Sequence, residues 1–206
     1  MRAYKQAMVC LMVLGGVVSS WAFPLKVDID VSTKRSRQQM GSGADGEARL
    51  ENVQLKIKIR KSGGDLPEGK LSAELYVIGR QIHTGNYGII DVKKGEFELL
   101  KDNDYAFTYE SPVYTLGKTS GNINVGGEYE TYLVVVSDPG GEMIDWRSGR
   151  ALRDEGVAFI RKLGPKTMFD KEGNVLGELE NPGEDFKAAV PAAVDPGDGD
   201  GAITTY

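Results

Sequence analysis

Apolar and polar residues alternate along several short segments of the chain. In the clearest of them, residues 53–60, Val, Leu and Ile occupy every second position, and Gln, Lys and Arg stand between them. Successive side chains of a β-strand point to opposite faces, so this alternation predicts a strand with one buried and one solvent-facing side. The same period marks further predicted strands at residues 25–31, 71–77, 96–99 and 105–109.

One segment departs from simple alternation. Residues 129–136 read Tyr-Glu-Thr-Tyr-Leu-Val-Val-Val, so the end of the segment is apolar on both faces. A strand that is covered on both faces carries such a continuous apolar run, and it lies inside a sheet rather than at its edge. We therefore expect a central strand here.

Glycine, proline, aspartate and asparagine gather between the predicted strands. They mark turns at residues 61–70, 94–95, 101–104 and 138–141, since these residue types adopt the backbone angles that turns require. Short strands joined by turns predict a mainly β fold, an antiparallel β-sandwich or, as the alternative, a barrel. The polar stretch Thr33–Asp45 is expected to be a mobile loop between the first two strands.

One short helix is predicted after the strands. Apolar residues recur on one face of a helix from about Gly149 to Leu163, with Ser148 as its N-terminal cap, and Gly164-Pro165 would end it. We expect this helix to cover an edge of the sheet. A small hairpin is predicted over residues 169–176, around the turn-forming run Lys-Glu-Gly-Asn.

The first residues of the chain have the pattern of a secretory signal peptide. Arg2 and Lys5 precede an apolar stretch over residues 7–18, and small residues lead up to Ala22. Cleavage is predicted after Ala22, with an uncleaved N-terminal anchor as the alternative. Cleavage would remove Cys10, the single cysteine, so the mature chain would have neither a disulfide nor a thiolate. The protein is expected to be exported, to the periplasm or outside the cell.

The length and net charge of the chain bear on its partners and its domain organisation. The chain has 206 residues and a formal net charge of −5, which disfavours nucleic acid as a partner because phosphates require a basic face. No stable membrane span is expected after cleavage. The predicted organisation is a signal peptide over 1–22, a β-sandwich domain over 23–148, an appended helix and hairpin over 149–180, and a disordered acidic tail rich in proline and glycine over 181–206.

Three motifs resemble known chemistry without completing it. His83, the single histidine, stands beside a turn, without a recognisable nucleophile motif. Residues 116–119, Leu-Gly-Lys-Thr, resemble the end of a phosphate-binding loop, but the required upstream glycine is replaced by Pro112, so we expect a polar hairpin loop there instead. Residues 198–201, Asp-Gly-Asp-Gly, resemble part of a calcium-binding loop that lacks two key ligands. We therefore predict a non-enzymatic protein with no catalytic residues, cofactor or metal site.

Two groups of side chains are candidates for contact with a ligand. Tyr105, Tyr109 and Trp146 could stack on sugar rings, although aromatic residues at alternate strand positions more commonly belong to a core. The run Lys34–Arg37 is a small basic cluster that could contact an acidic partner or an envelope polymer.

The alternating segments Val53–Ile59 and Tyr129–Val136, with the tight turns between them, resemble secreted bacterial immunoglobulin- or fibronectin-like β-sandwich modules over about residues 24–148. The cysteine pair and intervening tryptophan of true immunoglobulin domains are missing. The resemblance implies an exported protein with a structural or protein-interaction role in the cell envelope or outside the cell. The alternative is a carbohydrate-binding module that uses exposed aromatic side chains. The expected partner is an envelope protein or a polysaccharide.

Overall fold

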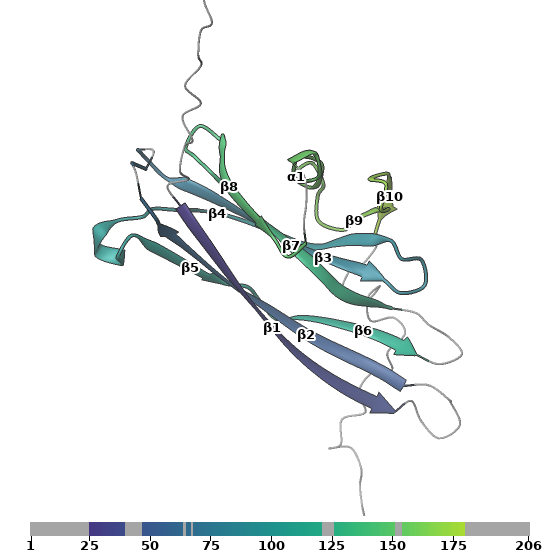
Figure 1. The fold of residues 1–206 in the computed structure, drawn as a ribbon. Coiled ribbons are helices and arrows are strands. Elements are labelled where there is room, and N and C mark those ends of the chain that lie inside the picture. The colour runs from purple at the N-terminus through teal and green to yellow at the C-terminus, as the bar shows by residue number, and fades with distance from the viewer. Residues whose placement is uncertain are drawn as a thin grey trace, which may run out of the picture.

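The computed structural model describes residues 25–39, 47–63, 65–66, 68–120, 126–150 and 154–179. These residues form a mainly β structure with two antiparallel sheets, one above the other (Figure 1). The predicted signal peptide, the tail over 181–206 and the motif at 198–201 lie outside the described residues.

The first sheet, sheet A, is built around one long strand. β2 (Glu47–Lys61) pairs with β1 (Leu25–Gln39) along its whole length. On its other side, β2 pairs with β6 (Tyr114–Ser120) near its start and with β5 (Ala106–Glu110) near its end. A short 3₁₀ turn, η1 (Lys101–Asn103), precedes β5.

The second sheet, sheet B, has six strands in the order β10-β9-β4-β3-β7-β8. β7 lies between β3 and β8, which confirms the central strand that its continuous apolar run predicts. The strands are β3 (Leu71–Gln81), β4 (Tyr87–Phe97), β7 (Gly127–Ser137), β8 (Met143–Ser148), β9 (Thr167–Phe169) and β10 (Val175–Glu178).

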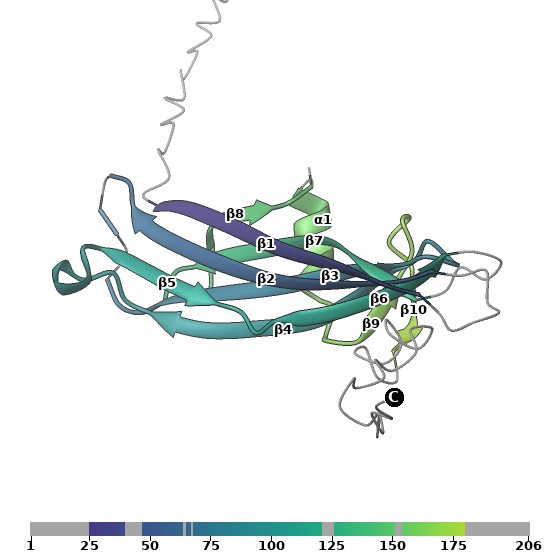
Figure 2. The ribbon, with the colours of Figure 1, turned by 90° about the horizontal axis from the view of Figure 1, so that it is seen from below.

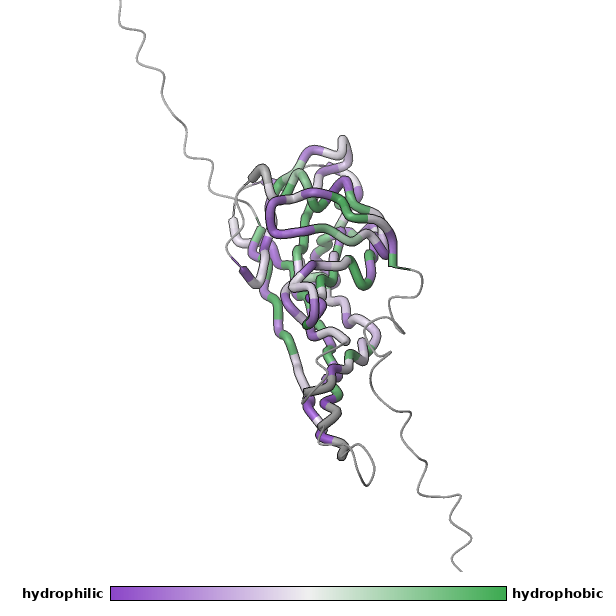
Figure 3. The backbone as a smooth tube through the Cα atoms, turned by 90° about the vertical axis from the view of Figure 1, so that its right-hand side faces the viewer, coloured by the Kyte–Doolittle hydropathy of each residue, from purple (hydrophilic) through white to green (hydrophobic). Residues whose placement is uncertain are grey.

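The two sheets enclose a first hydrophobic core, which we call the inner core. Val53, Leu55, Ile57 and Ile59 of β2 are all buried in it, as their alternation predicts. Sheet B contributes alternate residues of β3 and β7 to the same cluster. In the trace coloured by hydropathy, hydrophobic and hydrophilic stretches alternate along the strands (Figure 3). The arrangement is consistent with a β-sandwich.

A second hydrophobic core, the outer core, covers the other face of sheet B. Its centre comprises Tyr76, Ile78, Leu133 and Val135 from the sheet, together with residues of α1 (Asp154–Ile160) and of the segment that follows it. Seen from the sheet A side, α1 lies behind the strands (Figure 2). The helix therefore packs on a face of the sheet, and the expectation that it covers an edge is wrong.

The structure corrects three local predictions. β1 runs to Gln39, so the first part of the predicted loop Thr33–Asp45 is strand, because these polar residues pair in register with β2. Residues 94–95 lie inside β4 rather than in a turn. Residues 116–119 belong to β6 rather than to a hairpin loop, because they pair with the start of β2.

The helical region also differs from its prediction. Ser148 is the last residue of β8 rather than a helix cap, and its hydroxyl donates to the Tyr132 carbonyl. Gly149 and Arg150 form a bend, and the described helix starts at Asp154. β8 pairs with β7 as far as Ser148, so a strand occupies the position where the predicted helix was expected to begin.

The hairpin β9–β10 lies where the sequence predicts one, and β9 pairs with β4, so the hairpin extends sheet B.

Candidate functional site

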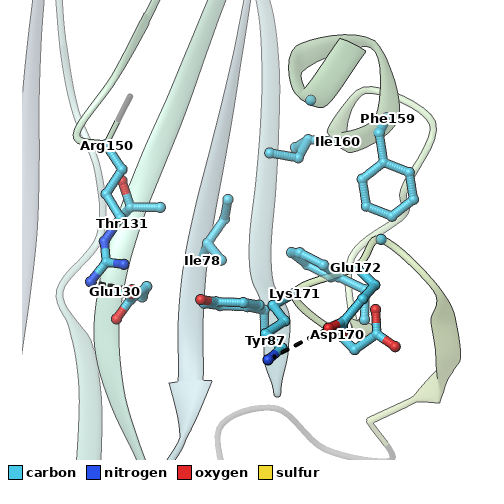
Figure 4. Close-up of a pocket in the computed structure, with 13 residues that line it drawn as sticks. Ile78, Tyr87, Glu130, Thr131, Arg150, Phe159, Ile160, Asp170, Lys171 and Glu172 are labelled. Carbon is cyan, nitrogen blue, oxygen red and sulfur yellow. Dashed lines mark ion pairs between the residues drawn. The ribbon is translucent and has the colours of Figure 1, made fainter. Parts of the chain in front are cut away.

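A pocket of about 500 Å³ lies on the outer face of sheet B. We call it the outer pocket. Its walls come from β3, β4 and β7, from α1, and from the turn between β9 and β10 (Figure 4). Its volume falls in the range of roughly 300–1,000 Å³ that is usual for ligand pockets.

Apolar and aromatic side chains form most of the pocket lining. Ile78 of β3 and Ile160 of α1 approach it from opposite sides (Figure 4). Tyr87 stacks on Phe169 with ring centroids 5.4 Å apart, and Phe159 meets Phe169 edge to face at 5.6 Å. These ring contacts join β4, β9 and α1, so the side chains that line the pocket also hold the helix and hairpin against the sheet.

An ion pair between buried Glu130 and exposed Arg150 forms the charged side of the pocket. The side chain of Glu130 is only 4% exposed, and its Oε1 lies 2.5 Å from Nη2 of Arg150. Its Oε2 lies 3.5 Å from Nε of Arg80. The pairing register of β3 with β7 passes from Thr131 to Tyr129, so Glu130 occupies a bulge. Bulges re-aim side chains, and here the bulge residue carries the carboxylate that faces the pocket.

The β9–β10 turn forms the opposite rim. Asp170 accepts hydrogen bonds from the backbone N–H and the side-chain amide of Asn174, each at 2.8 Å. These bonds from Asn174 hold the pKa of Asp170 below its ordinary value, so it remains charged and closes the turn. Lys171 and Glu172 form an exposed ion pair at 3.5 Å (Figure 4).

A second polar cluster fastens the end of α1 to the sheet. Arg161 donates to Oε1 of Glu74 at 3.1 Å, and the Tyr76 hydroxyl donates to Oε2 of the same carboxylate at 2.5 Å. Burial raises the pKa of Glu74, but the hydrogen bonds from Tyr76 and Arg161 outweigh it, so the net pKa lies below the ordinary value. Burial, followed by the contact with Glu74, raises the pKa of Tyr76. The carboxylate therefore stays ionised and the phenol stays neutral at physiological pH.

This arrangement determines what the pocket can bind. The charged groups around it are engaged with one another, Glu130 with Arg150 and Lys171 with Glu172. An incoming charged ligand would have to compete with these pairs, whereas a neutral group would leave them intact. The lining therefore suits a neutral ligand with an apolar face.

The structure does not bring the predicted ligand-contact residues Tyr105, Tyr109 and Trp146 together. Tyr109 is half-buried and packs against the inner core, whereas Trp146 packs against the outer core on the other side of sheet B. Tyr105 is exposed just before β5, with Nζ of Lys61 5.6 Å from its ring centroid. They thus occupy three separate environments.

Sequence reasoning missed the aromatic residues that line the outer pocket. Tyr87, Phe159 and Phe169 are far apart in the chain, and each could have been an ordinary core residue. The signal that could have suggested them is the apolar run of β7 on both faces, since it implies a second core on sheet B.

The structure also bears on His83, on metal-binding groups and on membrane-spanning helices. His83 is exposed in the turn between β3 and β4. Among the residues that the structure describes, no group of three or more His, Cys, Asp or Glu side chains could hold a metal ion. Across the same described ranges, no helix is long and apolar enough to cross a membrane.

Comparisons with known proteins assign no family. No family model and no curated protein matches the chain. A crystal structure from Akkermansia muciniphila is 11% identical and covers 77% of this chain and 87% of its own, with a TM-score of 0.21. An X-ray structure of a Northeast Structural Genomics Consortium target is 18% identical and covers 58% of this chain and 84% of its own, also with a TM-score of 0.21. At these TM-scores neither similarity carries an assignment of fold or function.

Proposed function

We propose that this chain is an exported, non-catalytic interaction protein that holds an apolar side chain of a partner protein in the outer pocket. The observation that carries the proposal is the pocket itself, with its apolar and aromatic lining and its internally paired charges. Apolar pockets with a few polar groups at the rim are the usual form of a binding site. The signal-peptide pattern of residues 1–22 supports export.

We also propose that the two layers form an immunoglobulin-like β-sandwich. The chain passes between the sheets after β2, after β4 and after β6, and such crossings are typical of Greek-key sandwiches. This fold hosts many functions, so the proposed role rests on the pocket rather than on the fold.

A carbohydrate-binding role is the second candidate. The ring of Tyr87 lines the same pocket as the Glu130–Arg150 pair. An aromatic face can stack on a sugar ring while nearby polar groups receive its hydroxyls. This version uses different aromatic residues from Tyr105, Tyr109 and Trp146.

The two candidates can be separated by titration of the chain from Phe23 with neutral probes, followed by NMR. The probes are N-acetyl-phenylalanine amide and N-acetyl-leucine amide for a protein partner, and neutral methyl glycosides for a sugar. We expect the blocked amino acids to shift the methyl signals of Ile78 and Ile160 in a saturable way. Shifts with the glycosides alone would replace the first proposal by the second, and shifts with neither class would overturn both.

A matched pair of variants assigns the binding to the pocket. Tyr87→Ala removes a ring from the pocket, and Tyr105→Ala removes an exposed ring elsewhere. Binding should weaken at least about tenfold in Tyr87→Ala, equivalent to about 1.4 kcal/mol, and stay unchanged in Tyr105→Ala. Equal losses in the two variants would contradict binding in the outer pocket.

A further inference from the structure

The outer edge of β1 is the longest open sheet edge among the described strands. β1 has 15 residues and pairs with β2 through all of them without a bulge, and no described strand pairs with its other side. Figure 2 shows β1 as the outermost strand of sheet A. The strand contains no proline. An edge of this kind presents a row of backbone N–H and C=O groups with which another strand can pair.

The apolar residues of β1 determine which of its side chains face solvent. Those at odd-numbered positions from Leu25 to Val31 belong to the inner core or pack against it. Successive side chains of a strand point to opposite faces, so the even-numbered residues lie on the outer face of sheet A. Asp30, Ser32 and Lys34 are accordingly exposed.

The charges on this outer face are divided along the strand. Asp28 and Asp30 lie in its first half, and Lys34 lies in its second half. Asp28 is already engaged, because Nη2 of Arg60 lies 2.5 Å and Nζ of Lys26 lies 3.5 Å from its carboxylate.

Asp30 and Lys34 remain available to a second molecule. Neither side chain makes a hydrogen bond or an ion pair within the described residues. The one neighbour whose pKa the charge of Asp30 affects is Lys56, which donates its own hydrogen bond to Glu110 at 2.7 Å. The outer face of β1 therefore carries an acidic and a basic side chain four positions apart, each without a partner of opposite charge in contact.

An antiparallel copy of β1 would bring these two charges together. When the strand is aligned with its copy over its full length, the central residue, Ser32, lies opposite Ser32 of the copy. The same register places Asp30 opposite Lys34 of the copy, and this contact occurs twice by symmetry. Directly opposite residues have Cβ atoms roughly 4.5–5.5 Å apart, so opposite charges there stabilise pairing and like charges oppose it. A register centred on Asp30 would instead place this aspartate opposite itself.

We propose that the chain forms a homodimer in which β1 pairs antiparallel with β1 of a second copy, with Ser32 on the twofold axis. The same surface of both copies forms such an interface. Backbone hydrogen bonds between the two edges provide affinity, and the two Asp30–Lys34 pairs select the register. The residues of the outer pocket do not belong to β1, so the dimer carries two outer pockets.

Self-association and charge reversal test the proposal together. Sedimentation equilibrium of the chain from Phe23, between about 1 µM and 1 mM, should show a monomer–dimer equilibrium. D30K and K34D each place like charges opposite one another, so each should weaken the dimer at least about tenfold. The double variant D30K/K34D exchanges the two charges and should restore the wild-type affinity. A wild type that stays monomeric at every concentration overturns the proposal.

Matched controls separate the edge of β1 from net charge. E98K and K101D make the same charge changes at exposed positions outside β1, and they should leave the dimer unchanged. Losses in these controls equal to those in D30K and K34D would show an effect of net charge and overturn the proposed interface. Failure of D30K/K34D to restore the dimer would likewise overturn the proposed register.

A single cysteine reports the position of the twofold axis. The chain from Phe23 contains no cysteine. In S32C the two thiols lie on the axis, where opposite Cα atoms are about 4.5–5.5 Å apart, within the range of a disulfide. In S36C they are about 27 Å apart along the paired strands. Mild oxidation should therefore link S32C into a covalent dimer and leave S36C unlinked. Equal linking of both variants, or none in S32C, would overturn the proposal.

Discussion

The inner and outer cores differ in how completely they are covered. The inner core lies between two sheets whose strands run up to fifteen residues, so long rows of alternate side chains meet face to face. The outer core is covered by α1, a helix of seven residues, and by the β9–β10 hairpin. These short elements leave part of the sheet uncovered, and the outer pocket occupies that place. A small covering layer thus leaves a cavity.

The cores also differ in what holds their parts together. Around the inner core, long strands pair and bury apolar side chains, and polar contacts between the sheets, such as the bond from the Tyr114 hydroxyl to Asp91 at 2.8 Å, add to this. In the outer core, the cluster of Glu74, Tyr76 and Arg161 ties the end of α1 to β3. A layer that depends on a few polar contacts can open without unfolding the rest, as ligand-binding regions commonly do.

The largest expected effect comes from the inner core. Leu55 is fully buried in β2, so Leu55→Ala should lower the free energy of unfolding by about 3 kcal/mol through lost burial and a residual cavity. Urea unfolding monitored by circular dichroism measures this. Leu100→Ala, which changes a leucine that is about half exposed, should cost less than about 0.5 kcal/mol. Similar losses in the two variants would contradict the placement of the inner core.

A smaller, pH-dependent effect is expected in the outer core. Glu74→Gln weakens the hydrogen bonds to Tyr76 and Arg161 and should cost about 1.5 kcal/mol at pH 7. Because the folded pKa of Glu74 is depressed, its contribution is present above the unfolded pKa, near 4.5, and is lost as the pH falls through the lower folded value. Melting temperatures of wild type and variant should therefore converge as the pH falls below the folded pKa of Glu74. A difference that persists unchanged in acid would refute the assigned role.

The smallest effect concerns Asp145, which is buried in β8 at the edge of sheet B. Its Oδ2 makes no hydrogen bond within the described residues, and Arg147 contacts Oδ1 at 2.8 Å. Burial raises the pKa of Asp145 against the opposing effect of Arg147. The resulting contribution to stability is present below the unfolded pKa and is lost as the pH rises through the higher folded value.

Asp145→Asn should therefore stabilise the protein at pH 7, by less than about 1 kcal/mol, and should not stabilise it at about pH 3. Thermal unfolding at the two pH values measures the difference. Asp102→Asn, at an exposed position in η1, is the matched control and should change neither melting temperature. Destabilisation by Asp145→Asn at pH 7 would show that the ion pair with Arg147 outweighs the cost of burial.

Much of the sheet structure is predictable from local pattern. The alternation in β2 identifies its buried face, and the continuous apolar run of β7 identifies a central strand, because both depend only on the two-residue period of a strand. The polar half of β1 is not predictable in this way. Residues 32–37 are exposed and become strand through pairing with β2, which is a tertiary effect.

The outer pocket could not be predicted for a related reason. Its parts come from β3, β4, β7, α1 and the β9–β10 turn, and only the fold brings them together. The bulge at Glu130 interrupts the two-residue period of the strand. The alternation of apolar and polar residues therefore does not predict on which face of the sheet this carboxylate lies. Arg35 and Arg37 belong to the basic cluster noted in the sequence, whereas Arg49 and Lys118 come beside this cluster only through the register of β1, β2 and β6.

The most direct test of the central claim, that the outer core is a separable layer which forms the pocket, is native-state hydrogen exchange on wild type and Glu74→Gln. We expect amides of β2 and β7 to exchange only through global unfolding, and amides of α1 and β9 to exchange through an opening of lower free energy. Glu74→Gln should lower the opening free energy of α1 and β9 more than that of β2. One common exchange free energy for both regions, reduced equally by the substitution, would contradict the account.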